Sequence, residues 1–249
     1  MMEKFHYMFN RKMWSAGIVF LLLLGIVLFS CKDEFNEGEE TFEGYGDIFI
    51  QKKKAGDEIL YAPYYHLVAN SSIESATVET PNGESVELAP YEYLTTYIRE
   101  PKEDEFSTSI MAAGTYQFTG SYDNNKTFTV TDMFDAGIID FPKIDSVSYD
   151  NTNYYIYLSW ETVSRANMYK VNLLNQAGNI VFSGAELTSE SNAFVIGIDT
   201  EGWISTPYTG DVLTIQLHAY LFDSDADDDN WYYNIECNSY TETQVVWGE

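Results

Sequence analysis

The sequence predicts an all-β fold built from two antiparallel β-sandwich domains. Twenty Tyr, fifteen Phe and five Trp occur among 249 residues, and aromatic residues favour the pleated, half-buried surface of a sheet. Short runs of alternating apolar and polar residues recur between clusters of Asn, Gly, Asp and Pro, and no long segment has helical periodicity. The length that follows a short leader suits two sandwiches of roughly 100 residues each. We expect these domains at residues 44–135 and 136–249.

Residues 1–30 have the layout of an export signal. The leader carries Lys4, Arg11 and Lys12, and an uncharged, largely apolar run follows from Met13 to Ser30. A run of this length can also cross a bilayer as a single helix, so an uncleaved membrane anchor is the alternative.

The residues around Cys31 indicate lipidation. Leu28, Ser30 and Cys31 resemble the lipobox of bacterial lipoproteins, although Phe29 stands where a smaller residue is usual. The resemblance implies that Cys31 is acylated and becomes the first residue of the mature protein. The residues Cys31-Lys32-Asp33-Glu34 also resemble the surface-export signal of Bacteroidota lipoproteins, which implies a lipid-anchored protein on the outer face of the outer membrane. Residues 31–43 are dense in carboxylates, and their mutual repulsion predicts a solvated acidic tether.

The charge balance excludes one class of partner. The chain has 13 basic and 39 acidic residues, a formal net charge of −26. Nucleic-acid binding depends on Lys and Arg that neutralise phosphates, and here acidic residues outnumber basic ones three to one. Once Cys31 is acylated, Cys237 is the remaining cysteine, so no intrachain disulfide and no cysteine-based metal cluster can form.

Two hairpins organise the first predicted domain. In the run ATVETPNGESVEL, Asn82-Gly83 predicts a two-residue type I′ turn with Val78 and Val86 in the flanking strands. The run TYQFTGSYDNNKTFTVTD predicts a second hairpin, and DIFIQKK and ILYAPYYHLVA predict earlier strands. The entry Gly114-Thr115-Tyr116 resembles the last part of small immunoglobulin-like modules on bacterial surfaces.

The alternation of apolar residues between the two faces of a strand is clearer in the second predicted domain. Ile156, Leu158 and Trp160 fall on one face of a strand, and Tyr169 and Val171 alternate in the same way in the next strand. Trp160, the lead-in from residue 166 and Tyr169-x-Val171 resemble strands B and C of a fibronectin type III domain. The later runs AFVIGID, VLTIQLHAYLF and TQVVW then correspond to strands E, F and G. Such sandwiches carry many unrelated functions, so this resemblance implies a fold alone.

One acidic segment, LFDSDADDDNWYYNIE, has the composition of a metal site. The first, third, fifth and twelfth positions of a helical calcium loop supply oxygen ligands, and this register has acids at the same places. The candidate calcium ligands are Asp225, Asp227, Asp229 and Glu236. Predicted strands flank the segment in place of helices, and the alternative is an acidic, solvated loop tip.

Sequence motifs of catalysis are missing, and we expect a protein that is not an enzyme. After the leader the chain has two histidines, His66 and His218, in different predicted domains. His218 alternates with the apolar residues of its predicted strand, which is typical of a side chain on the outer face of a sheet. The sequence contains no Gly-rich phosphate loop after a strand, no HExxH and no GxSxG.

The aromatic residues favour binding over catalysis. Tyrosines cluster in the first domain, and Trp231, Tyr232 and Tyr233 adjoin the acidic segment of the second. Tyr and Trp offer an apolar face and a polar edge, which suits sugar rings and protein partners; the alternative is that they pack their own sheets. We expect a surface lipoprotein that binds a glycan or an outer-membrane protein. It resembles accessory lipoproteins of Bacteroidota polysaccharide-uptake systems, and the alternative is a structural or adhesive component of a surface assembly.

Overall fold

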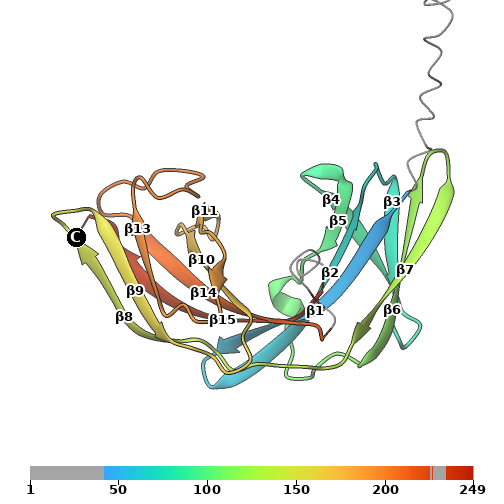
Figure 1. The fold of residues 1–249 in the computed structure, drawn as a ribbon, viewed down its shortest axis with the longest axis horizontal. Helices are drawn as coiled ribbons and strands as arrows, with labels where there is room; N and C mark the ends of the chain where they lie inside the picture. The colour runs from blue at the N-terminus through green and yellow to red at the C-terminus, as the bar shows by residue number, and fades with distance from the viewer. Residues whose placement is uncertain (1–41, 225, 227–233, 249) are drawn as a thin grey trace, which may run out of the picture. The chain divides into compact units, whose positions relative to one another are not determined.

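Fifteen strands and one short 3₁₀ helix form the regular structure of the described residues, which are 42–224, 226 and 234–248 of a computed structural model (Figure 1). The first half holds β1 (Gly44–Ala55), β2 (Glu58–Ala69), β3 (Ser75–Glu79), β4 (Ser85–Tyr91), β5 (Tyr93–Arg99), the 3₁₀ helix η1 (Glu103–Glu105), β6 (Gly114–Tyr122) and β7 (Lys126–Phe134). The second half holds β8 (Lys143–Asp150), β9 (Tyr155–Glu161), β10 (Met168–Leu174), β11 (Ile180–Ser183), β12 (Leu187–Thr188), β13 (Ala193–Gly197), β14 (Val212–Phe222) and β15 (Ile235–Val246). The predicted all-β fold class is confirmed. Within the described residues no helix is long and apolar enough to span a membrane.

The strands form two sheets. The larger has the order β11-β10-β14-β15-β1-β2-β5-β4-β3-β6-β7, with β12 beside β10, and the smaller has the order β13-β9-β8. β1 and β15 pair in parallel, so strands from the two ends of the described chain lie side by side in one sheet. The predicted domain boundary at residues 135 and 136 falls between β7 and β8 and stays a prediction, and residues Phe42–Glu249 cluster as one compact unit.

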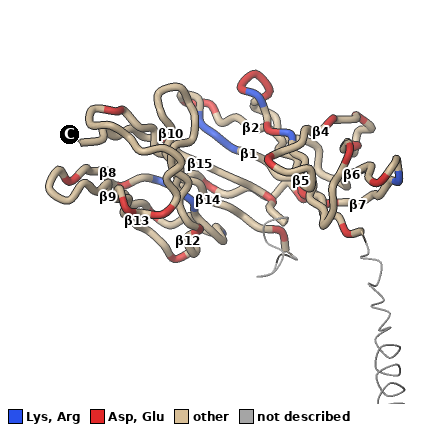
Figure 2. The backbone as a smooth tube through the Cα atoms, turned by 90° about the horizontal axis from the view of Figure 1, so that it is seen from above, with Lys and Arg blue, Asp and Glu red and all other residues tan. Residues whose placement is uncertain are grey.

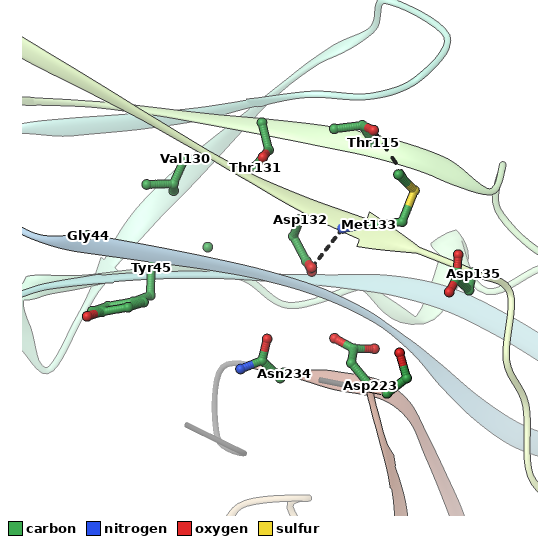
Figure 3. Close-up of a pocket in the computed structure, with 12 residues that line it drawn as sticks. Gly44, Tyr45, Thr115, Val130, Thr131, Asp132, Met133, Asp135, Asp223 and Asn234 are labelled. Atoms are coloured by element: carbon green, nitrogen blue, oxygen red, sulfur yellow. Dashed lines mark hydrogen bonds between the residues drawn. The ribbon is translucent and has the colours of Figure 1, made fainter. Parts of the chain in front are cut away.

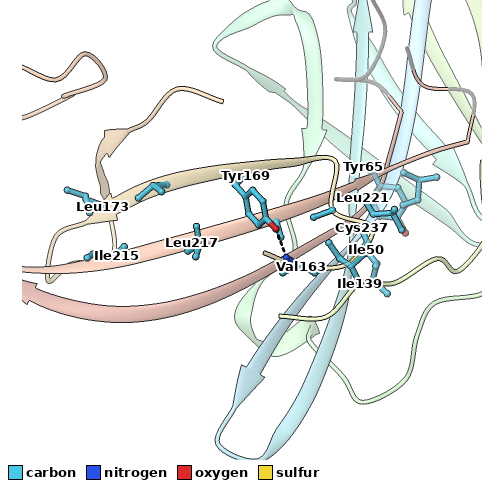
Figure 4. Packing of buried hydrophobic residues seen from close by; sticks show 14 of the residues in the cluster. Ile50, Tyr65, Ile139, Val163, Tyr169, Leu173, Ile215, Leu217, Leu221 and Cys237 are labelled. Carbon is cyan, nitrogen blue, oxygen red and sulfur yellow. Dashed lines mark hydrogen bonds between the residues drawn. The ribbon is translucent and has the colours of Figure 1, made fainter. Parts of the chain in front are cut away.

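The second half is a sandwich of β8, β9 and β13 against β10, β11, β14 and β15. Alternate residues of each strand point inward, as predicted: Trp160 of β9 is 2% exposed, and its ring centroid lies 5.6 Å from that of Tyr169 of β10. Leu173 of β10 and Leu217 of β14 are fully buried in the same cluster (Figure 4). The strand order agrees with the lettering B, C, E, F and G expected for β9, β10, β13, β14 and β15.

The hydroxyl of Tyr169 in β10 fixes the connection between β9 and β10 by a hydrogen bond. Its oxygen accepts a hydrogen bond from the backbone N–H of Val163 at 2.5 Å, in a buried setting (Figure 4). We expect Tyr169→Phe to lower the free energy of unfolding by about 1–3 kcal/mol, because it leaves that N–H buried without an acceptor. Urea unfolding followed by circular dichroism measures the loss. Tyr208→Phe, at a side chain that is 80% exposed, is the matched control and should change little; an equally small effect of Tyr169→Phe would contradict the expectation.

The first half packs through close approach of its strands. Gly46 of β1 lies against Phe118 of β6, because a Cβ on Gly46 would come within 2.5 Å of the phenyl ring. Val78 of β3 and Phe118 are fully buried in the same core. The closeness of β1 to β6 and β7 brings polar side chains of β1 and β7 together at the site described below.

Both predicted hairpins of the first half are present, with one difference in turn type. Val78 pairs with Val86 as expected, but the connection spans residues 80–84, and positive φ is confined to Gly83 at +80°. The Gly83 N–H donates to the carbonyl of Thr80 at 2.9 Å, which places Pro81 at the second position of the turn. Pro fixes a negative φ suited to that position of a type I turn, so the turn begins earlier than a two-residue turn at Asn82-Gly83 would.

Basic residues are few, and three of them are consecutive on β1. Figure 2 shows the run of Lys52, Lys53 and Lys54 on that strand, with acidic residues spread over many loops. The Lys52 ammonium donates to the carbonyl of Ile139 at 2.6 Å and lies 4.3 Å from the ring centroid of Phe141. This lysine therefore ties β1 to the segment between β7 and β8.

Candidate functional site

Most of the site residues predicted from the sequence lie outside the described residues. These are Cys31, Asp225, Asp227, Asp229, Trp231, Tyr232 and Tyr233, together with the leader 1–30 and residues 31–41 of the tether. Lipidation, the aromatic binding site and the calcium loop therefore stay predictions. The last two tether residues are described: Phe42 stacks on Tyr122 with ring centroids 3.9 Å apart, and the Glu43 N–H donates to Asn70 Oδ1 at 3.0 Å.

Glu236 is the one predicted calcium ligand that the structure describes. It lies in β15 and is 5% exposed. Its carboxylate accepts hydrogen bonds from the backbone N–H groups of Gly137 and Asp135, the latter at 3.5 Å. In this arrangement Glu236 anchors the segment that leads from β7 to β8.

A different set of carboxylates meets at the base of the acidic segment. Asp47 of β1, Asp132 of β7 and Asp223, directly after β14, each place one oxygen within 4.8 Å of the other two. We call these three residues the aspartate cluster. Among the described residues, the oxygens of this cluster lie close enough together to bind one metal ion.

Asp47 is the buried member of the aspartate cluster. It is 0% exposed, and its Oδ1 accepts a hydrogen bond from the Ile235 N–H at 3.1 Å. Its Oδ2 is buried and has no hydrogen-bond partner among the described residues. Burial, followed by repulsion from the Asp132 carboxylate, raises the pKa of Asp47 well above its ordinary value.

The other two members are half-buried and held by neighbouring backbone. Asp132 Oδ2 accepts a hydrogen bond from the Ile48 N–H at 2.8 Å, and Oδ1 accepts one from the Met133 N–H at 2.7 Å. The backbone N–H of Asp223 donates to the carbonyl of Asn234 at 2.9 Å, which closes the base of the β14–β15 connection. Three segments distant in the sequence thus position the cluster.

A pocket of about 710 Å³ opens beside the cluster (Figure 3). Asp132 and Asp223 line it with their carboxylates facing one another. The remaining lining residues come from the same strands and connections: Gly44, Tyr45, Gly46, Thr115, Val130, Thr131, Met133, Asp135, Ser224 and Asn234. The pocket is polar around the cluster and large enough for solvent or a small ligand.

The tyrosines of the first half divide into buried and exposed groups. Tyr65 and Tyr97 are 6% and 5% exposed, so they pack the sheets, as the alternative interpretation has it. Tyr91 is 46% exposed and Tyr93 is 72% exposed, where β4 turns into β5. Leu94, the next residue of β5, is 59% exposed, and we call Tyr91, Tyr93 and Leu94 the β4–β5 tip.

His66 and His218 lie on different strands, and the prediction that they belong to different domains stays a prediction. His66 is in β2, and burial lowers its pKa to about 4. His218 lies on the outer face of β14, opposite the buried Leu217, and Nδ1 is 3.1 Å from Asn238 Oδ1. Burial lowers the pKa of His218 to about 4, so its imidazole is neutral at pH 7.

Comparisons with known proteins find likeness among solved structures. No protein-family model matches the chain, and no curated protein matches it. A two-domain fibronectin type III segment of chicken tenascin is similar at 12% identity and a TM-score of 0.28, over 82% of this chain and 99% of that one. A tetra-tandem repeat from the extending region of a large adhesion protein is similar at 15% identity and a TM-score of 0.26, over 82% and 50%. The BSP domain of a biofilm associated protein is similar at 15% identity and a TM-score of 0.24, over 80% and 29%.

Proposed function

We propose that this protein is a non-catalytic binding module, held at the outer surface of the outer membrane by a lipid on Cys31. The β4–β5 tip is its contact surface, and a neutral glycan is its ligand. The observation that carries the proposal is the exposure of Tyr93 and Leu94, at 72% and 59%, beside Tyr91. Exposed aromatic and apolar side chains gathered at one place are typical of interaction sites.

The chemistry of the tip suits a sugar ring. The phenol ring of Tyr93 offers a flat apolar face to the C–H groups of a pyranose, and its hydroxyl can bond to sugar hydroxyls. Glu92, between the two tyrosines, adds a carboxylate acceptor. The net charge of −26 repels anionic polymers, which favours uncharged saccharides over acidic ones.

A glycan array probed with the full chain, purified in detergent, tests the proposal. We expect binding of a neutral saccharide that Tyr93→Ala weakens by about tenfold or more, because exposed aromatic anchors dominate such contacts. Tyr208→Ala is the matched control, since Tyr208 is 80% exposed on a loop of the second half. Retained binding in Tyr93→Ala with loss in Trp231→Ala would move the site to the segment predicted from the sequence.

The second candidate function is that of a spacer in a surface assembly. It is favoured by the pairing of β1 with β15, which joins strands of both halves in one sheet and suits a rigid connecting element. A spacer would give no signal on the glycan array. Cross-linking on intact cells would then identify the neighbouring protein.

A further inference from the structure

Asp47 keeps a carboxylate oxygen buried without a hydrogen-bond partner among the described residues. The residue is 0% exposed, and Oδ1 is satisfied by the Ile235 N–H while Oδ2 is not. An unsatisfied buried acceptor is rare in folded proteins and costs free energy, more so when it is charged. A cation or a proton at Oδ2 would account for it.

The surroundings of the Asp47 carboxylate favour a cation. One carboxylate oxygen each of Asp47, Asp132 and Asp223 lie within 4.8 Å of one another. Calcium binds oxygen at about 2.3–2.6 Å, so two ligands of one calcium ion lie at most about 5 Å apart. The spacing of the three oxygens therefore fits a shared calcium ion.

We propose that the aspartate cluster binds one calcium ion through Asp47, Asp132 and Asp223. The ligands are hard carboxylate oxygens with no thiolate or imidazole in the cluster, which disfavours zinc. Calcium accepts six to eight ligands in irregular geometry, and the pocket beside the cluster leaves room for water at the remaining positions. Magnesium usually keeps several waters and is bound through one or two carboxylates, so a set of three carboxylates favours calcium.

The proposed ion ties together segments that otherwise repel one another. It neutralises the charge where β1, β7 and the end of β14 meet, so binding stabilises the folded state by mass action. This inference is independent of what the β4–β5 tip binds, because the tip residues are not part of the cluster.

Thermal unfolding with and without calcium gives the first test. We expect the full chain in excess EDTA to gain about 5 °C or more in Tm when Ca²⁺ reaches a hundredfold excess over Kd. Terbium, which occupies calcium sites, gives a second readout: Tyr45 lines the adjoining pocket, so tyrosine excitation should sensitise Tb³⁺ luminescence that Ca²⁺ displaces. An unchanged Tm at about 10 mM Ca²⁺, above the Kd range of extracellular calcium modules, would overturn the proposal in favour of a protonated Asp47.

The variant Asp47→Asn tests whether the Asp47 carboxylate binds calcium or has a structural role alone. We expect this variant to be at least as stable as the wild type in EDTA, because one of three repelling charges is gone, and to lose the calcium-dependent rise in Tm and the Tb³⁺ signal. Should Asp47→Asn not fold, Asp223→Ser removes a half-buried ligand with less disturbance of the core.

Two matched controls locate the ion. Asp135→Asn changes an exposed carboxylate that lines the same pocket outside the cluster, and it should keep the full calcium response. The triple variant Asp225→Asn, Asp227→Asn, Asp229→Asn tests the ligands predicted from the sequence. A response that survives Asp47→Asn but disappears in the triple variant would overturn the assignment to the aspartate cluster.

Discussion

Replacing Trp160 with Ala is expected to lower the free energy of unfolding by about 3–5 kcal/mol. The indole is 2% exposed in β9 and faces Tyr169 across the second sandwich, with ring centroids 5.6 Å apart. Its removal loses the transfer free energy of a buried indole and leaves a cavity that the surrounding strands fill only in part. A loss of this size is a large share of the stability of a typical domain.

Urea unfolding followed by far-UV circular dichroism measures this loss without relying on tryptophan emission. Tyr157→Ala is the matched control, because Tyr157 lies in the same strand on the opposite face and is 40% exposed; its loss should stay below about 1 kcal/mol. Trp160→Phe should cost less than Trp160→Ala, since it keeps an aromatic ring and removes an indole N–H that has no partner among the described residues. Equal losses for Trp160→Ala and Tyr157→Ala would contradict the core assignment.

Acid is expected to remove up to about 3 kcal/mol of stability through His218 alone. Burial lowers the pKa of His218 to about 4, whereas an unfolded His titrates near 6.5. Between these values the unfolded state binds a proton that the folded state does not, so stability rises with pH. Above about pH 6.5 the imidazole is neutral in both states and His218 causes no loss of stability. The free energy of unfolding then decreases as the pH falls from 6.5 toward 4.

Burial is the main cause of the lowered pKa of His218, and its neighbours act in both directions. Asn238 of β15 accepts from Nδ1, which raises the pKa, and Asn172 of β10 lies 3.4 Å from Nε2. Lys170 of β10 is a charged neighbour, and its repulsion lowers the pKa further. Tyr240 of β15 covers the ring, with centroids 5.1 Å apart, and Tyr220 lies on the other side.

Unfolding free energies of the wild type and His218→Gln, measured from pH 7 to pH 4, test this expectation. The wild type should lose more stability over this interval than the variant, by up to about 3 kcal/mol. The comparison cancels the many carboxylates that titrate in both proteins. Parallel pH profiles would mean that His218 is protonated in the folded state at an ordinary pKa.

The strands were largely predictable because a half-buried sheet imposes a period of two on the sequence. Ile156, Leu158 and Trp160 alternate with polar or aromatic residues, and all three are buried as that pattern indicates. Turn residues likewise located both hairpins of the first half. The turn type was less predictable, because Pro81 and Gly83 compete to define where the turn begins.

The aspartate cluster was not predictable, because its members are single acidic residues in three unrelated strands or connections. Asp47 and Asp132 occupy positions where alternation merely predicts a polar residue, and nothing local marks one acid among 39. Sequence motifs detect ligands that lie close together along the chain. The calcium site was therefore predicted in segment 225–236, which follows Asp223 in the sequence. A pairing between β1 and β15 brings Asp47 beside the base of that segment, and such long-range pairing has no local signature.

The same pairing determines the order in which the chain can finish folding. Ile50 of β1 pairs with Cys237 of β15, so this side of β1 lacks the neighbour it has in the fold until residues 237–239 have been synthesised. Contacts between residues so far apart in sequence form slowly, because a long loop must close first. During that interval β1 is an open strand edge that can pair with another chain, and a secretion route that keeps the polypeptide unfolded until it is complete would avoid this hazard.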